Sequence, residues 1–262
     1  MTTTLFEIQN LSLSYGQNKV LDDLCFCITE GQILTVIGEN GSGKSSLLNT
    51  LAGLIPIHSG TVNLNDKSLH EHGPQKLAQQ ISSLGQNDIQ IFDMPVWSRI
   101  AQGYIPHQSA TFFQGPHETE AITQIAQRLQ IDNCLNRHLG QLSGGERRRV
   151  HLARALVNPK PQIIILDEPF ANIDVGHQTL VVELLRERLQ QGHTIICAIQ
   201  QLHLVFELQG NVLGLKDGQK IMMGPPHAAL TETNLERLFS RRARYHKSDD
   251  DFHGILFKTS KL

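Results

Sequence analysis

The segment that most constrains this chain of 262 residues is a glycine-rich loop at residues 38–45, which reads Gly-Glu-Asn-Gly-Ser-Gly-Lys-Ser. The loop follows an apolar run, Ile33–Ile37, and precedes apolar residues with helical spacing between Leu47 and Ala52. A loop of the pattern G-x-x-x-x-G-K-[ST] between a strand and a helix wraps the phosphates of a nucleotide with backbone N–H groups. The alternative is a glycine-rich turn with a solvated lysine. The flanking strand and helix favour a site for a nucleoside triphosphate.

Composition limits the partners that this chain can attract by itself. Its 23 basic and 25 acidic residues almost balance, so no strong overall field draws it to nucleic acid or to an anionic membrane. No apolar stretch approaches the roughly 18 to 20 residues that cross a bilayer, and Met1–Thr4 lacks the charged start of a signal peptide. We therefore expect one large α/β domain that is cytoplasmic unless a partner holds it at a membrane.

The cysteines and a histidine pair do not predict a metal site. Cys25 and Cys27 fit one face of a strand, and with Cys134 and Cys197 they do not form a zinc pattern, so we expect reduced thiols. His70 and His72 lie in the polar stretch 70–76 without a further ligand nearby, which favours a solvated loop.

Short apolar runs ended by polar residues predict a buried sheet. Ile163–Leu166 is apolar throughout, as a strand covered on both faces of a parallel sheet must be. Asp167 and Glu168 follow it directly, at the carboxyl end of the strand, where open α/β sheets bind ligands. Asp217 and the glycine after it predict a hairpin. The other predicted strands are Leu5–Leu13 with Ile8, Leu11 and Leu13 pointing inward, Thr61–Leu64, Ile81–Leu84, Thr194–Ile199, Asn211–Leu215 and Lys220–Met223.

Helical patterns dominate the middle of the chain. Residues 87–140 have few β-branched runs and a glutamine-rich pattern at 121–129, which suggests a helical subdomain inserted into the core. Leu-Ser-Gly-Gly-Glu at 142–146 opens a further helix, and we interpret the arginines at 147–149 as a solvated face rather than an anion contact. The remaining predicted helices are Val175–Gln190 and one beginning at Thr231, followed by a charged tail in which 241–244 is solvated.

The order of these motifs resembles the ATP-binding subunits of ABC transporters, over about residues 15–224. The matching segments are the phosphate loop, Gln86, Leu-Ser-Gly-Gly-Glu at 142–146, the strand running into Asp167 and Glu168, and Asp174. The resemblance implies an α/β P-loop NTPase (RecA-like) core with an N-terminal antiparallel β region and an inserted α-helical subdomain. It divides a single ABC ATPase domain, 1–262, into a core at 1–86 and 159–230, a helical subdomain at 87–158, and a C-terminal helix and tail at 231–262.

The resemblance also implies roles for individual residues. Glu168 would polarise the attacking water as general base, with Gln86 and Gln200 beside it. Mg²⁺ would be held by Ser45, Gln86 and Asp167, and Tyr15 would stack on adenine. The implied ATP-binding residues are Tyr15, Gly38, Glu39, Asn40, Gly41, Ser42, Gly43, Lys44, Ser45, Ser46, Ser143, Gly144, Gly145 and Asp174.

A second copy of the chain is implied by the signature at 142–146. Gly144 and Gly145 at a helix start expose amides that favour an anion. In the family each monomer presents this surface to ATP held by the other, in a head-to-tail, two-fold dimer that is coupled through the position of Asp174.

The residue after one of the buried strands departs from the family pattern, as do the neighbours of Asp174 at 170–173. The family usually has a histidine that contacts the γ-phosphate after the strand at 194–199, where this chain has Gln200. The Gln200 amide can donate a hydrogen bond but cannot take a proton, so we expect slow hydrolysis or a heavier dependence on Glu168. The alternative is that His203 takes the role.

A nucleotide-binding unit without spanning helices implies separate transmembrane permease subunits, and thus a peripheral position at the cytoplasmic face of the inner membrane. Phe92, Met94 and Trp97 are candidates for the groove that receives a permease helix, although each also fits the core. Residues 101–108, Gly-Pro-Pro at 224–226 and residues 235–238 resemble the branch that imports iron-siderophore complexes, haem or cobalamin, whose periplasmic binding protein is an indirect partner. The alternatives are another ABC importer or exporter, or a soluble ABC protein that acts on nucleic acid or as a regulator. No nucleic acid partner is expected, because tandem ATPase units and a long coiled coil are absent.

Overall fold

The structure is a computed structural model that describes residues 3–85, 93–107, 115–241, 243–247 and 253–258. Its centre is a sheet of six strands in the spatial order β10-β9-β3-β8-β7-β6. All neighbouring pairs are parallel except β9 and β10, which form the predicted hairpin. The strands are β3 (Ile33–Ile37), β6 (Ile81–Leu84), β7 (Ile163–Asp167), β8 (Thr194–Ala198), β9 (Asn211–Lys216) and β10 (Gln219–Gly224).

A second, antiparallel sheet lies beside this one and has the order β2-β1-β4-β5. Its β1 runs as one strand through the predicted region, and Ile8, Leu11 and Leu13 are buried as expected. Together with α1 (Lys44–Leu51) this sheet covers one face of the parallel sheet in a shared apolar cluster. Its strands are β1 (Thr4–Tyr15), β2 (Asn18–Thr29), β4 (Ser59–Leu64) and β5 (Lys67–Ser68).

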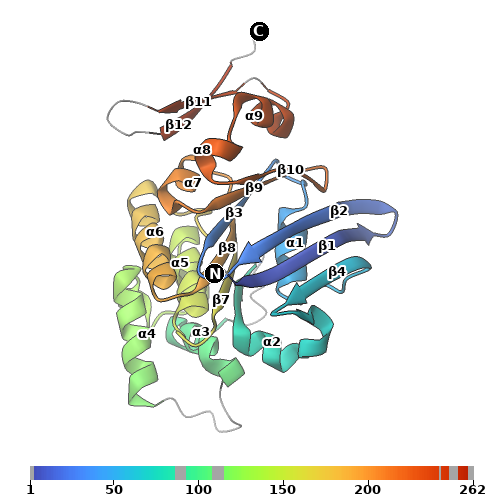
Figure 1. Ribbon diagram of the computed structural model, residues 1–262. Coiled ribbons are helices and arrows are strands. Elements are labelled where there is room, and N and C mark those ends of the chain that lie inside the picture. Colours follow the sequence, from blue (N-terminus) through green and yellow to red (C-terminus); the bar gives the residue numbers. More distant parts are fainter. Residues whose placement is uncertain (1–2, 86–92, 108–114, 242, 248–252, 259–262) are drawn as a thin grey trace.

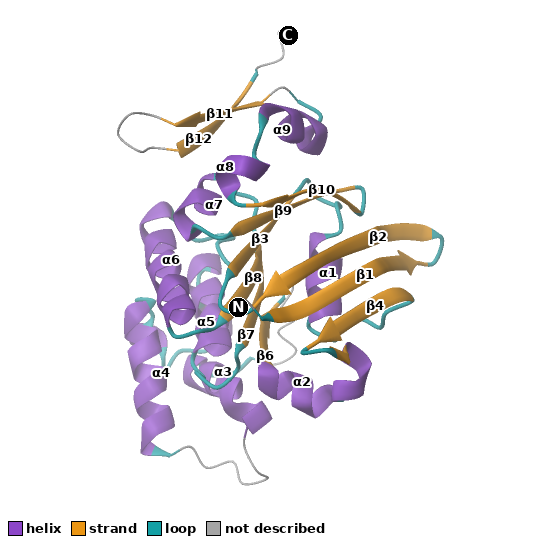
Figure 2. Ribbon diagram, in the orientation of Figure 1, coloured by secondary structure: helices purple, strands orange, loops and turns teal. Residues whose placement is uncertain are grey.

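Helices cover the other face of the parallel sheet, on the left of Figure 1, and form the second apolar cluster. Alternate residues of β3, β7 and β8 belong to the two clusters, which is why every residue of these strands is buried. Figure 2 shows these helices together on this side of the sheet. They are α3 (Val96–Ala101), α4 (Pro116–Arg128), α5 (Gly144–Leu156), α6 (Val175–Gln190) and α7 (His203–Leu208).

Three surface predictions were wrong in part. The stretch 70–76 is mostly exposed, as expected, but it is not a loop: it holds the end of a 3₁₀ turn and the start of α2 (Pro74–Gln80), with Leu69 and Leu77 buried on either side. Arg148 and Arg149 are not a solvated face, since both are buried. The tail is not uniformly solvated either, because Ala243 is buried.

The C-terminal segment beyond the sheet combines short helices with a hairpin, at the top of Figure 1. The predicted helix starts where expected, since the Thr231 side chain accepts a hydrogen bond from the backbone N–H of Asn234 at 3.2 Å. The hairpin has no signal in the sequence comparable to that of β9 and β10. These elements are α8 (Pro226–Ala229), α9 (Glu232–Phe239), β11 (Ala243–Lys247) and β12 (His253–Phe257).

The four cysteines are free, as predicted. Cys25 and Cys27 are exposed on one face of β2, whereas Cys134 and Cys197 are buried. Complete burial raises the pKa of Cys197 to about 12. Among the described residues there is no group of three or more histidine, cysteine or acidic side chains that could hold a metal ion, and no helix long and apolar enough to cross a membrane.

Candidate functional site

The phosphate loop leaves the carboxyl end of β3 and turns directly into α1. Gly38 and Gly43 have φ angles of 156° and 101°. A Cβ atom on Gly38 would lie 2.2 Å from the carbonyl oxygen of Leu215, and one on Gly43 would lie 2.7 Å from that of Val20. Only glycine fits at these two positions, because the loop is pressed against the strand ends around it.

This loop borders a cavity of about 370 Å³ at the carboxyl ends of the parallel strands, which we term the catalytic edge. Most of the predicted catalytic and phosphate-loop residues line this cavity. Residues from the carboxyl ends of β7 and β8 meet the loop here, as expected for ligands of an open α/β sheet. The lining consists of Val20, Asn40, Gly41, Gly43, Lys44, Ser45, Ser46, Glu168 and Gln200. Val20, at the antiparallel sheet, was missed by the sequence analysis because no motif marks it.

Lys44 is buried at the base of this cavity, with its side chain turned back onto the loop. Its Nζ donates hydrogen bonds of 2.9 Å to the carbonyl oxygens of Gly38 and of Glu39. Burial lowers the pKa of Lys44, and the nearby carboxylates of Glu168 and Asp167 oppose that shift. A phosphate here would supply the negative charge that a buried ammonium group favours.

The carboxylate of Asp167 provides a test of whether the site suits Mg²⁺. Burial raises the pKa of Asp167, although a hydrogen bond from Ser45 and the charges of Arg148 and Lys44 act against the rise. The Asp167 Oδ1 atom is buried and has no hydrogen-bond partner among the described residues. A buried, unsatisfied carboxylate oxygen beside a serine hydroxyl is a donor set that fits a hard divalent cation.

Glu168 follows on a strained turn that aims its side chain at the cavity. Its φ angle is 52°, in the left-handed region that non-glycine residues seldom adopt. Its backbone N–H donates to the carbonyl oxygen of Ala198 at 3.0 Å, and its carboxylate accepts a hydrogen bond from Gln200 Nε2. The same Nε2 donates to Asn40 Oδ1 at 3.2 Å, so Gln200 links the phosphate loop to Glu168. His203 is exposed at the start of α7 and does not line the cavity.

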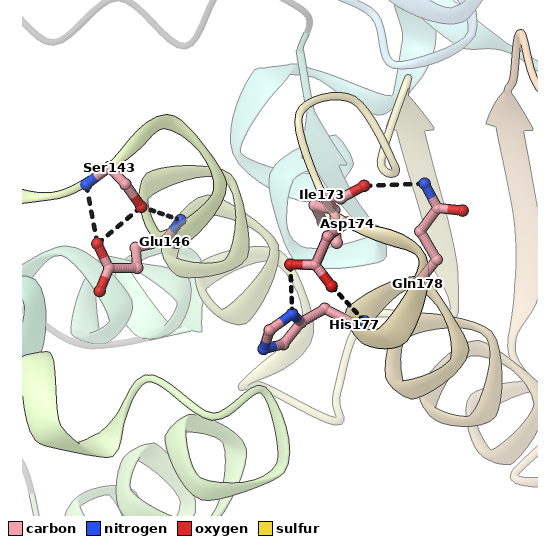
Figure 3. Close-up of polar contacts among 6 residues, drawn as sticks. All are labelled: Ser143, Glu146, Ile173, Asp174, His177 and Gln178. Carbon is pink, nitrogen blue, oxygen red and sulfur yellow. Dashed lines mark hydrogen bonds and ion pairs between the residues drawn. The ribbon is translucent and has the colours of Figure 1, made fainter.

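The signature forms a separate surface on the same side of the molecule as Asp174 (Figure 3). Ser143 caps α5: its Oγ accepts from the Glu146 backbone N–H at 3.2 Å and donates to the Glu146 carboxylate at 2.7 Å. Asp174 caps α6, and its carboxylate also pairs with Nδ1 of His177 at 2.6 Å. The hydrogen bonds from the side chain and then the backbone of His177 lower the pKa of Asp174. His177 was missed by the sequence analysis, because an i, i+3 contact in a first helical turn leaves no motif.

The remaining predicted residues lie outside the cavity or outside the described part of the chain. Tyr15 is half exposed at the end of β1, and none of Tyr15, Ser143 or Asp174 lines the cavity. Gln86 and Phe92 fall in the range 86–92, outside the described residues. One chain therefore presents two surfaces, the phosphate-loop cavity and the capped ends of α5 and α6.

The fold and the site define a class: this is a nucleotide-binding P-loop ATPase of the kind that carries a second, signature-bearing surface. Comparison with known proteins agrees. The family model described as ABC transporter matches residues 21–171. The hemin import ATP-binding protein of Rhodococcus jostii is 33% identical over 87% of this chain and 77% of the relative. The ferric enterobactin transport ATP-binding protein of Escherichia coli is 30% identical over 89% of this chain and 86% of the relative.

The fold is also found among solved structures. An inward-facing conformation of a putative metal-chelate type ABC transporter matches 98% of this chain with a TM-score of 0.80 at 24% identity. The chain belongs to the ABC transporter family, as an ATP-binding subunit that hydrolyses ATP to power transport and works with transmembrane permease components.

The contact between the signature and the loop after β7 generates a prediction about stability. A Cβ atom on Gly145 would lie 2.8 Å from the backbone carbonyl oxygen of Asn172, whereas one on Gly144 would meet nothing within 4 Å. Gly145→Ala should lower the free energy of unfolding by about 1–3 kcal/mol, because a backbone contact must open. Gly144→Ala is the matched control and should leave it unchanged or raise it by up to about 1 kcal/mol. Urea denaturation of both variants measures the difference, and equal stabilities would contradict the packing described.

Proposed function

We propose that this chain energises the import of a metal chelate, such as an iron-siderophore complex, haem or cobalamin. The support is the agreement among relatives, which are named for the import of hemin, ferric enterobactin, iron(3+)-hydroxamate and cobalamin. In this proposal the chain lies peripherally at the cytoplasmic face of the inner membrane, and a periplasmic binding protein is an indirect partner. The division into a core, a helical subdomain at 87–158 and a tail at 231–262 stays a prediction.

Hydrolysis in the proposal proceeds at the cavity beside the phosphate loop. The loop amides and Lys44 hold the phosphates, and Tyr15 stacks on the base. Ser45, Gln86 and Asp167 would hold Mg²⁺, which would supply positive charge to stabilise the phosphates. Glu168 orients the attacking water and accepts its proton, and the observation that carries this role is its position at the cavity, next to Asp167.

The second surface completes the site on another copy of the chain. Ser143, Gly144 and Gly145 lie at the N-terminus of α5, where free amides and the helix dipole favour an anion. We place ATP of the partner subunit against this surface, in a two-fold arrangement that includes Asp174. The placement rests on the separation of the two surfaces in one chain, since the signature does not line the cavity.

Glu168→Gln tests this function directly. The substitution removes the base but leaves the phosphate contacts, so the turnover number should fall by at least about 100-fold while ATP is still bound. With MgATP the variant should elute as a dimer in size-exclusion chromatography, and Glu168→Gln combined with Lys44→Ala should remain a monomer. The proposal would be wrong if Glu168→Gln stayed monomeric in saturating MgATP and if the permease also failed to bring two copies together.

Gln200 occupies the position from which the γ-phosphate is contacted in this proposal. The support is geometric, because its amide lies on the cavity wall between Asn40 and Glu168, whereas His203 is exposed outside it. An amide offers hydrogen bonds at this point but no titrating group.

Two substitutions separate the roles of Gln200 and His203. Gln200→His should raise the ATPase rate severalfold, because a protonated imidazole places a positive charge beside the phosphate. The rate should also become pH-dependent near the ordinary pKa of histidine, about 6.5. His203→Ala should leave the rate unchanged. Steady-state rates between pH 5.5 and 8.5 provide the measurement. A large loss in His203→Ala with no gain in Gln200→His would assign the role to His203 instead.

We propose a docking groove for the permease between the core and the helical subdomain. A cavity of about 260 Å³ lies here, bordered by the end of α1, by α2 and by residues 102–106. Leu54 lies on its wall and is 66% exposed, an apolar contact available to a partner helix. Met94 and Trp97 are partly buried against the helical core and do not line this cavity, which favours the core role for both.

The groove can be tested by the association of the chain with membranes that contain its permease. Leu54→Glu should reduce the fraction that sediments with these membranes by about tenfold, because it places a charge in an apolar contact. Leu256→Glu is the control, since Leu256 is 62% exposed on β12, away from the groove. Both variants should keep the ATPase rate of the free subunit. Equal membrane binding by Leu54→Glu and wild type would contradict this docking site.

A further inference from the structure

Arg148 connects three parts of the chain that meet behind the catalytic edge. It lies on α5, four residues after Gly144, and only 8% of its surface is exposed. One terminal nitrogen of its guanidinium donates to the carbonyl oxygen of Gly85, just after β6, at 3.2 Å. The other donates to the carbonyl oxygens of Asp167 and of Glu168, the latter at 2.7 Å. A helix that starts at the signature is thus tied to the strand end that carries the carboxylates.

The carbonyls that Arg148 holds belong to a turn that needs support. Glu168 has a φ angle of 52°, a conformation that costs about 1–3 kcal/mol for a non-glycine residue and persists only when its surroundings enforce it. The two carbonyls flanking the Glu168 Cα atom determine where its side chain points, and Arg148 holds both. A guanidinium is suited to this, because its planar donors can hold several acceptors at once.

The chain after this turn contacts α5 a second time, at the signature. Gly145, in the first turn of α5, packs so closely on the carbonyl oxygen of Asn172 that no side chain fits between them. Ala171 in turn donates its N–H to the carbonyl oxygen of Glu168 at 3.0 Å. The segment from Glu168 to Asn172 therefore contacts α5 at both of its ends.

We propose that Arg148 is a positioning residue for ATP hydrolysis, which makes the placement of Glu168 depend on the position of the signature helix. When the signature closes on ATP of the partner subunit, α5 carries Arg148 and thereby sets the Glu168 turn. The inference rests on the proposed role of Glu168 as the base. Arg148 then links ATP contact at the signature surface to the placement of Glu168 at the cavity.

Arg154, on the same helix, provides a matched control that separates positioning of Glu168 from a purely structural effect. Arg154 also ties α5 to β6, by donating to the carbonyl oxygen of Ser83 at 2.9 Å, but Asp167 and Glu168 are held by Arg148. Arg154→Gln therefore weakens the attachment of the helix without releasing the Glu168 turn. Arg148→Gln removes the hold on the turn, and Arg148→Lys keeps a charge and a shorter reach in case the glutamine variant does not fold.

The first measurement is the steady-state ATPase activity of the full chain. Arg148→Gln should lower the turnover number by about 10- to 100-fold with the KM for ATP changed less than about threefold, because Lys44 and the loop still bind the phosphates. Arg148→Lys should fall between wild type and Arg148→Gln. Arg154→Gln should stay within about twofold of wild type. An equal loss in Arg154→Gln, or a loss in Arg148→Gln that lies in KM alone, would overturn the proposal.

The second measurement asks whether Arg148 acts through Glu168. In a Glu168→Gln background, adding Arg148→Gln should change the residual rate less than about twofold, because a positioning residue has nothing left to position. A further loss as large as in the wild-type background would overturn the proposal for Arg148 and leave Glu168 as the base. A wild-type rate in Glu168→Gln alone would overturn the proposed function together with the inference.

Discussion

The parallel pairing of β3, β7 and β8 is the constraint on which the rest of the structure depends. The strands end at one edge of the sheet, so Lys44, Glu168 and Gln200 reach a common cavity although more than a hundred residues separate the first from the others. The pairing holds because both faces are apolar and each is covered by its own cluster. A strand with one polar face could not lie between two such layers.

Charged side chains are buried at the carboxyl ends of these strands, which is a second consequence of the parallel pairing. Lys44, Asp167 and Arg148 come from different elements, and all three are buried near the ends of the strands. Each would be costly alone, and each has partners: carbonyl oxygens for the two cations, a serine hydroxyl and nearby positive charge for the carboxylate. The opposing directions of the pKa shifts of Lys44 and Asp167 have this cause, because burial disfavours the charged form of either group.

The helix ends on the other surface are organised by capping. Ser143 and Asp174 each satisfy backbone N–H groups of the helix that they begin, and Glu146 and His177 hold these caps in place. The caps therefore stabilise the helices and also fix a polar surface whose residues do not line the cavity (Figure 3). The close contact of Gly145 with Asn172 joins the two caps through the intervening chain.

The sequence by itself determined the local elements and most of the catalytic edge. Ile163–Leu166 had to be a buried strand because it has no polar face. The glycine, lysine and serine pattern at 38–45, between an apolar run and a helical pattern, indicated a phosphate loop. The order of the motifs was sufficient to identify the family.

Only the tertiary structure decided where the polar residues of α5 and of the surface segments lie. Arg148 looked like one of three solvated arginines, and it is buried because its helix packs against the ends of β6 and β7. His177 and Val20 gave no signal, since their roles come from neighbours that folding brings together. Patterns along a chain report which face of an element is apolar, whereas the partner of a buried charge depends on which elements meet, and that is a property of the packed molecule.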